Sequence, residues 1–156
     1  HNIVEGGTTR FHSVENGLRA INKDENNTIV AIHDGVRPFV NQDVIAKGFS
    51  TAQKYGSAIP VIPLYESVRE VSNAYSKPIE REKLKIVQTP QFFQLRLIRN
   101  AYNIPYSETF TDDASVYETL GKQVVLIDGN KENIKITVPS DILYANALIN
   151  ERYKQI

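Results

Sequence analysis

The segment Ile29-Val-Ala-Ile-His-Asp-Gly-Val-Arg-Pro-Phe-Val40 is a short apolar run that ends in an aspartate, a glycine, an arginine and a proline. Such a run is typical of a buried strand that stops in a loop. Open α/β sheets bind their ligands in loops at the carboxyl ends of strands. Asp34 could hold a divalent cation there, and Arg37 could contact phosphate oxygens. The segment predicts a nucleotide-phosphate site, although a weak ion pair between Asp34 and Arg37 alone would explain the same residues.

Strand and helix patterns alternate on both sides of this segment. The alternation favours an α/β fold with a mostly parallel sheet flanked by helices. Pro60 and Pro63 place one predicted strand at an edge or leaving the sheet. The predicted strands cover 27–32, 57–64, 123–128 and 133–137. Three helices are predicted in the first two thirds of the chain: one capped by Thr8 or Thr9, one from Asn41 to Gly56, and one over 92–102. A fourth helix is capped by Thr111 and closed by Gly121. The last helix begins at Pro139, with Ile142, Ala145 and Ile149 facing inward.

The stretch from Glu66 to Val87 differs from its surroundings, because it is charged and poor in large apolar residues. We expect a pair of extended segments that projects from the body. An arm of this kind cannot bury itself alone and could embrace a partner subunit. A long solvated loop would explain the pattern equally well. We expect residues 1–156 to form a single domain with this dimerisation arm at about 66–87.

The composition excludes several classes of function. Eighteen basic and eighteen acidic residues give a formal net charge of zero, which argues against a nucleic-acid or anionic-membrane partner. The chain has no cysteine, and no apolar run approaches the roughly 18 residues of a membrane span. We therefore expect a cytoplasmic protein. The chain has no methionine and opens on His1-Asn-Ile-Val, which looks like the tail of a strand, so we expect an upstream segment.

Three further motifs carry polar groups that could bind a ligand. Gly6-Gly-Thr-Thr-Arg-Phe-His-Ser13 leads into a helix, whose N-terminal amides bind anions, although an ordinary turn and cap is the simpler explanation. Thr89-Pro-Gln91 is a turn whose side chains could contact a polar substrate. Asn133-Ile-Lys-Ile-Thr137 alternates, which places Lys135 on a polar face. No serine–histidine–acid or cysteine–histidine pairing indicates a covalent nucleophile.

The order of these motifs resembles that of methylerythritol-phosphate cytidylyltransferases. The resemblance rests on Gly6-Gly-Thr-Thr-Arg-Phe-His-Ser13, His33-Asp-Gly-Val-Arg-Pro38, Val87-Gln-Thr-Pro-Gln-Phe92, Phe110-Thr-Asp-Asp-Ala-Ser115 and Asn133-Ile-Lys-Ile-Thr-x-Pro-x-Asp141. It implies a Rossmann-like nucleotidyltransferase fold, CTP and Mg²⁺ as ligands, and a homodimer made by exchanged arms. The implied reaction is attack of a sugar-alcohol phosphate on the α-phosphate of CTP, with release of pyrophosphate.

The resemblance also assigns roles to individual residues. It implies that Lys135 and Arg81 are catalytic, and that Asp34 binds the metal. The implied CTP-binding residues are Gly6, Gly7, Thr8, Ser13, Asp34, Gly35 and Arg37. The implied acceptor-binding residues are Ser67, Arg81, Thr89, Thr111 and Lys135, with Ser67 and Arg81 reaching the neighbouring subunit.

Two departures from the family pattern stand out. Glu66-Ser67 replaces an expected Asp-Thr, which keeps a carboxylate and a hydroxyl. The family's glycine-rich phosphate loop and its lysine precede the point where this sequence starts, so we expect residues 1–156 alone to be inactive and the full-length protein to be the enzyme. A ribitol-5-phosphate cytidylyltransferase and a non-catalytic nucleotide-binding or dimerisation module are the alternatives.

Overall fold

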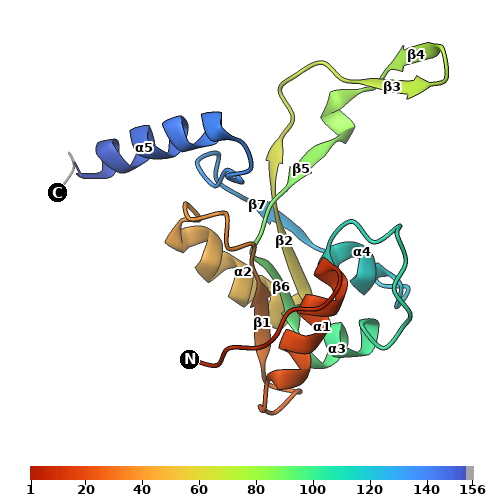
Figure 1. Ribbon diagram of the computed structural model, residues 1–156. Coiled ribbons are helices and arrows are strands. Elements are labelled where there is room, and N and C mark those ends of the chain that lie inside the picture. The colour runs from red at the N-terminus through yellow and green to blue at the C-terminus, as the bar shows by residue number, and fades with distance from the viewer. Residues whose placement is uncertain (154–156) are drawn as a thin grey trace.

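A computed structural model describes residues 1–153 and shows a sheet surrounded by helices, with a long arm on one side (Figure 1). The helices are α1 (Arg10–Ala20), α2 (Gln42–Tyr55), α3 (Leu95–Ala101), α4 (Asp113–Glu118) and α5 (Pro139–Tyr153), with a 3-10 turn at Arg81–Lys83. The strands are β1 (Ile29–Ile32), β2 (Ser57–Pro63), β3 (Arg69–Ser72), β4 (Tyr75–Pro78), β5 (Lys85–Val87), β6 (Gln91–Gln94) and β7 (Leu126–Asp128).

The main sheet confirms the α/β class, but its strand directions are mixed. Its order is β1-β6-β2-β5, with β7 beside β2. Strand β6 runs antiparallel to both β1 and β2, β5 is antiparallel to β2, and only the β2–β7 pair is parallel. The expected parallel direction therefore holds for β1, β2 and β7, whereas β6, between β1 and β2, and β5, at the end of the order, run the opposite way.

Strand β6 replaces the first turn of the helix predicted over 92–102. Phe92 and Phe93 are completely buried on opposite faces of the sheet, and Phe92 packs against Gly48 of α2 so closely that a Cβ there would lie 2.2 Å from its ring. The helical pattern begins only at Leu95. Pairing with two strands and burial of both rings outweigh the helical spacing that the sequence suggested.

The prolines of β2 do not place it at an edge, which corrects the prediction from Pro60 and Pro63. On one side β2 pairs with β6 at Ser57 and Ala58 and then with β5 from Val61 onward. Pro60 lies at the change of partner, where its carbonyl accepts the Gln88 N–H at 2.9 Å. A missing N–H costs least at such a break in the ladder.

The helix ends follow the capping rules. Thr9 caps α1, Asn41 caps α2, and Gly56 ends α2 with φ 95°, all as predicted. The cap of α4 is Asp112 rather than Thr111, because Asp112 and Ser115 form a reciprocal capping box.

The C-terminal part of the chain departs from the prediction in two ways. Residues 133–137 form no strand, which corrects the prediction; the Ile136 N–H instead bonds the Val36 carbonyl at 2.9 Å. In α5, Ala145 is buried, whereas Ile142 and Ile149 are 52% and 40% exposed. Helix α5 leads away from the sheet, so most of its apolar side chains have no surface beneath them (Figure 1).

The expected arm is present as the antiparallel β3–β4 hairpin, which projects far from the body (Figure 1). Every residue of both strands is exposed. The arm is shorter than predicted, because β5 at its end pairs with β2 and belongs to the main sheet.

Candidate functional site

Asp34 follows β1 directly and lies at the centre of a cluster of cations. Its Oδ2 atom is 3.0 Å from Lys135 Nζ and 3.7 Å from Arg37 Nε, and its Oδ1 atom is 3.6 Å from Arg10 Nε. The Asp34 side chain is only 14% exposed. The structure thus brings together Asp34, Arg37 and Lys135, as the sequence predicted, and adds Arg10.

The pKa of Asp34 reflects two opposing influences. Burial raises the pKa of its carboxyl, but the hydrogen bond and charge of Lys135, with the charges of Arg10 and Arg37, outweigh burial and hold the pKa below its ordinary value. Burial also lowers the pKa of the Arg37 guanidinium, which Asp34 partly offsets. Asp34 is therefore a carboxylate at neutral pH, surrounded by more positive charge than it neutralises.

A second set of contacts fixes the loop that carries Asp34. The Asp34 N–H donates to Thr89 Oγ1 at 3.0 Å. His33 Nε2 lies 3.0 Å from the Arg37 carbonyl oxygen and so donates to it, which leaves His33 Nδ1 to accept from the Thr89 hydroxyl at 3.0 Å. Arg37 NH1 donates to the carbonyl of Asn133 at 2.9 Å. The predicted acceptor residue Thr89 is therefore beside Asp34, where it holds the loop.

The buried side-chain amides of Asn133 and Gln88 hold the backbone around this loop in place. The Asn133 side chain, which is fully buried, donates to the Thr89 carbonyl at 2.8 Å. Gln88 donates to the carbonyls of Asn130 and Asn133 at 2.9 and 3.2 Å. These bonds anchor the segment that presents Lys135, so its position does not need the strand that the alternation predicted.

The glycine-containing loop before α1 is ordered by its own polar groups. Ser13 Oγ accepts the Gly7 N–H at 2.9 Å and donates to the Thr9 carbonyl at 3.0 Å. A Cβ at Gly7 would lie 2.3 Å from His12 Cβ, so the turn requires glycine there. Gly6 and Thr8 are exposed in the same loop. The predicted base-binding residues therefore form one turn at the N-terminus of α1, beside Arg10.

Arg10 joins this turn to a buried carboxylate. Its two terminal nitrogens bond both oxygens of Asp113 at 2.9 and 2.6 Å, and Tyr102 donates its hydroxyl to Asp113 Oδ1 at 2.6 Å. Asp113 is completely buried. Its hydrogen bond raises the pKa of Arg10 far above the ordinary range, against the effect of burial, and burial chiefly raises the pKa of Tyr102. Arg10 therefore stays charged.

The remaining predicted residues lie apart from this cluster or contribute little to it. Ser67 and Arg81 are exposed at the base of the arm, where Arg81 NH1 donates to the Tyr65 carbonyl at 2.6 Å. Thr111 lines a small cavity with Arg10 and Phe11. Gly35 is exposed, and a Cβ there would have no neighbour within 4 Å. One chain alone does not bring the arm residues to Asp34.

Asp34 fits a particular kind of metal site. Among residues 1–153 no group of three or more histidine, cysteine, aspartate or glutamate side chains could hold a metal ion. A site with one carboxylate is unsuited to an all-protein cage. It suits Mg²⁺, which proteins usually bind through one or two carboxylates together with substrate phosphates.

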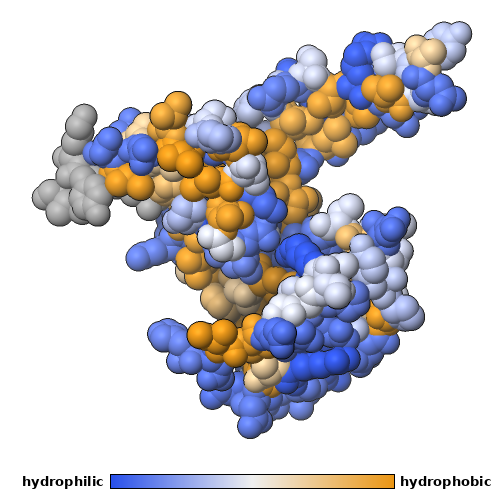
Figure 2. All heavy atoms as spheres, viewed as in Figure 1, coloured by the Kyte–Doolittle hydropathy of each residue, from blue (hydrophilic) through white to orange (hydrophobic). Residues whose placement is uncertain are grey.

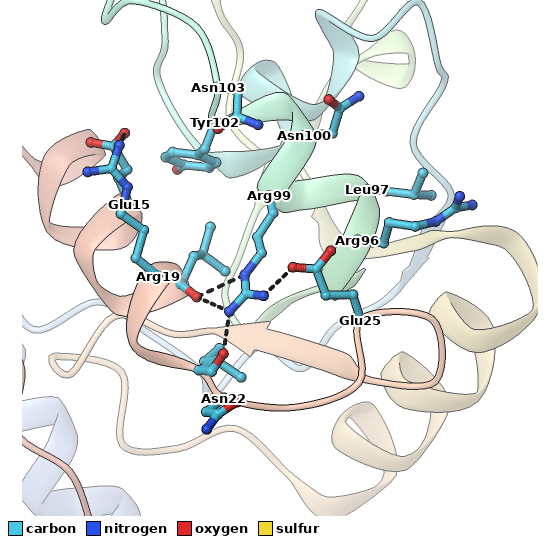
Figure 3. A pocket seen from close by; sticks show the side chains of 12 residues that line it. Glu15, Arg19, Asn22, Glu25, Arg96, Leu97, Arg99, Asn100, Tyr102 and Asn103 are labelled. Atoms are coloured by element: carbon cyan, nitrogen blue, oxygen red, sulfur yellow. Dashed lines mark hydrogen bonds and ion pairs between the residues drawn. The ribbon is translucent and has the colours of Figure 1, made fainter.

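A cavity of about 770 Å³ lies elsewhere, between α1 and α3 (Figure 3). Arg99 at its centre pairs with Glu25 and donates to the carbonyls of Leu18 and Ile21 at the C-terminal end of α1. Through these contacts the Arg99 guanidinium joins α1 to α3. The cavity is a structural junction, and its lining includes none of Asp34, Arg37 and Lys135.

The sequence patterns did not indicate the residues that support the Asp34 cluster. Arg10 lies in the motif Gly6–Ser13 and Asp113 in the motif Phe110–Ser115, but neither motif gave them a role at the site. Gln88, Gln91 and Asn133 are also buried. Polar side chains within short apolar runs were the available signal, since buried polar groups need specific partners. The partners themselves are distant in sequence and cannot be read from a pattern.

Comparison with known proteins gives a consistent result. Residues 1–151 match the family described as 2-C-methyl-D-erythritol 4-phosphate cytidylyltransferase. Relatives of that name from Phocaeicola vulgatus and Bacteroides fragilis are 48% and 49% identical over 149 residues, covering 96% of this chain and 67% of each relative. The crystal structure of the Thermus thermophilus protein of that name superposes with a TM-score of 0.81 at 35% identity, covering 94% of this chain and 72% of that chain.

Proposed function

The chain belongs to the 2-C-methyl-D-erythritol 4-phosphate cytidylyltransferase family of nucleotidyltransferases, and we propose that the Asp34 cluster carries out the reaction. In that reaction the cytidylyl group of CTP passes to 2-C-methyl-D-erythritol 4-phosphate, a step of isoprenoid precursor synthesis. The observation that carries the proposal is the meeting of Asp34, Arg37 and Lys135 at the end of β1, beside the glycine turn of α1. A phosphate-rich substrate needs this combination of charges.

The turn before α1 receives the nucleoside part of CTP in this proposal. Gly7 lets the backbone approach the base closely, and Gly6 and Thr8 flank it in the same exposed turn. Ser13 fixes the turn through Gly7, because its hydroxyl bonds the Gly7 N–H. Exposed amides at a helix N-terminus suit the polar edge of a base or a ribose hydroxyl.

Asp34 holds the metal and the ribose side of CTP, with Gly35 and Arg37 shaping the same pocket. Bound Mg²⁺ would neutralise charge on the triphosphate and orient it. Before the substrate binds, Lys135 and Arg37 occupy Asp34 Oδ2 at 3.0 and 3.7 Å. Phosphate oxygens of CTP would offer Lys135 and Arg37 new partners. The Asp34 carboxylate would then be available to hold the metal.

The chemical step requires an oxygen of the acceptor phosphate to attack the α-phosphorus of CTP. A new P–O bond forms, the bond to the β-phosphate oxygen breaks, and pyrophosphate leaves. Lys135, with its side chain 45% exposed, stabilises the charge that develops on the α-phosphate or on the acceptor phosphate. Thr89 and Thr111 line the acceptor pocket, which Ser67 and Arg81 of a second subunit complete. Positioning and charge neutralisation suffice, without a covalent intermediate.

A pyrophosphate-release assay on the full-length protein tests this function. We expect release with CTP and 2-C-methyl-D-erythritol 4-phosphate, and little release with CTP and ribitol 5-phosphate at the same concentration. Faster release with ribitol 5-phosphate would identify the other acceptor. Binding of CTP without release with either acceptor would identify a non-catalytic module.

We further propose that the protein is a homodimer formed by exchange of the arms. The β3–β4 hairpin has no core of its own, and a lone two-stranded hairpin is at best marginally stable in water. Apolar surface gathers on α5 and along the arm (Figure 2). It includes Val71 and Tyr75 on the hairpin, 73% and 83% exposed, and Leu143 on α5, also 73% exposed. Exposed apolar surface on this scale marks an interaction site.

Tyr75→Asp should convert the dimer to a monomer in light scattering, because the new charge would have to be buried in the interface. Tyr55→Asp is the matched control, since Tyr55 is 56% exposed at the end of α2 and far from the arm in sequence. Replacing Arg69–Pro78 by a short linker should have the same effect as Tyr75→Asp and leaves β5 in the sheet. A dimer that survives both arm variants would contradict the arm exchange.

No helix within residues 1–153 is long and apolar enough to cross a membrane. A cytoplasmic location stays a prediction.

A further inference from the structure

Cations contact Asp34 from more than one side. The ion-pair contacts of Lys135 and Arg37 are to Oδ2, at 3.0 and 3.7 Å, whereas that of Arg10 is from Nε to Oδ1, at 3.6 Å. The orientation of the carboxylate plane therefore depends on where the Arg10 guanidinium stands. A carboxylate that turned both oxygens toward Lys135 would present a different face to a metal.

The position of the Arg10 guanidinium is itself fixed by Asp113. The two form a bidentate pair, with nitrogen–oxygen distances of 2.9 and 2.6 Å, and Asp113 is completely buried. Such a fork-to-fork pair sets the plane of the guanidinium as well as its location. Tyr102, 3% exposed, donates a third bond to Asp113 from the end of α3. Only the Nε edge of Arg10 remains free to face Asp34.

Arg10 is also the first residue of α1, immediately after the Thr9 cap and the glycine turn. One side chain thus connects the turn, the Asp34 carboxylate and the start of α4. We propose that Arg10 is a positioning residue, which orients Asp34 for Mg²⁺–CTP and holds the glycine turn in register with it through the buried carboxylate of Asp113. This inference rests on the proposed function.

The simpler alternative is that Arg10 only neutralises a buried aspartate. Removing Arg10 would then lower the melting temperature, because it leaves a buried charge without its partner. The experiment must therefore separate binding from folding. Calorimetric binding of CTP at several Mg²⁺ concentrations provides a readout that does not depend on turnover.

Arg10→Lys keeps the charge but cannot bridge two carboxylates as the forked group does. In the full-length protein we expect about tenfold weaker CTP binding and a raised half-saturating Mg²⁺ concentration, the effect typical of losing an outer-shell partner of a metal ligand. The KM for the acceptor should change much less. CTP binding and Mg²⁺ dependence within twofold of the wild type would overturn the proposal.

The double variant Arg10→Met/Asp113→Asn removes both charges, so no buried carboxylate is left without its cation. Its melting temperature should exceed that of Arg10→Met alone, while the weak CTP binding persists. Recovery of wild-type CTP binding together with stability would leave Arg10 a purely structural role.

Tyr102→Phe is the matched control, because it removes one bond to Asp113 and leaves the Arg10 fork intact. It should lower the melting temperature without changing the Mg²⁺ dependence. Normal turnover by the wild type in the same assays keeps a failure of this inference distinct from a failure of the proposed function.

Discussion

Asp34→Asn should lower kcat/KM for CTP about a thousandfold in the full-length protein. A metal held at a transferring phosphate contributes several kcal/mol to transition-state stabilisation, and each 1.36 kcal/mol corresponds to a factor of ten. The amide keeps the volume of the side chain but removes its charge. The three surrounding cations, Arg10, Arg37 and Lys135, would then repel one another and any incoming metal.

The control for this variant is Asp128→Asn. Asp128 also ends a strand and also pairs with a lysine, since Lys47 Nζ lies 3.1 Å from its carboxylate, but its side chain is 95% exposed. We expect that variant to keep its activity and its stability. If Asp34→Asn retained turnover within about threefold of the wild type, Asp34 would have no metal role, and a loop ion pair would explain the cluster. Melting curves of both variants distinguish lost chemistry from lost folding.

Lys135→Ala should lower kcat about a hundredfold while leaving the melting temperature nearly unchanged. A fixed donor at developing phosphate charge is typically worth about 10²–10³ in rate. The side chain is 45% exposed, and its segment is anchored by the buried Asn133 rather than by the lysine. Folding should therefore tolerate its loss.

Lys47→Ala is the matched control for that variant, because the Lys47–Asp128 pair has nearly the same length as the Lys135–Asp34 pair, 3.1 against 3.0 Å. An exposed pair contributes little to stability or activity. A large fall in melting temperature for Lys135→Ala, with a proportionate loss of activity, would show instead that the lysine belongs to a structural ion pair.

The sequence predicted the residues that gather around Asp34 better than the buried residues that support them. Asp34 was found because an acid that ends an apolar strand is a local pattern, and Thr9, Asn41 and Gly56 were found because caps are local as well. Strand β6 was read as helix because the burial of Phe92 and Phe93 depends on β1 and β2, which come earlier in the chain. Local spacing cannot report a distant partner.

The same reason explains the errors at the C-terminal end and at the site. The alternation at 133–137 is real, but there is no neighbouring strand within the described residues for it to pair with. The apolar positions of α5 follow helical spacing, yet Ile142 and Ile149 meet no core. Arg10 and Asp113 lie 103 residues apart in the sequence, so their pairing could not be inferred from either motif.

The insertion of β6 between β1 and β2 has a consequence for how the chain folds. Among the described residues β1 pairs with β6, and this pairing can form only after α2, β2, the whole arm and β5 have been made. Contacts between such distant segments form slowly, and an unpaired apolar strand is open to aggregation until they do. The arm lengthens the loop that must close, but closure entropy grows only with the logarithm of loop length. The chain can therefore vary the length of its hairpin at little cost to folding speed, whereas any weakening of β6 also weakens the β1–β6 pairing that joins the two ends of this segment.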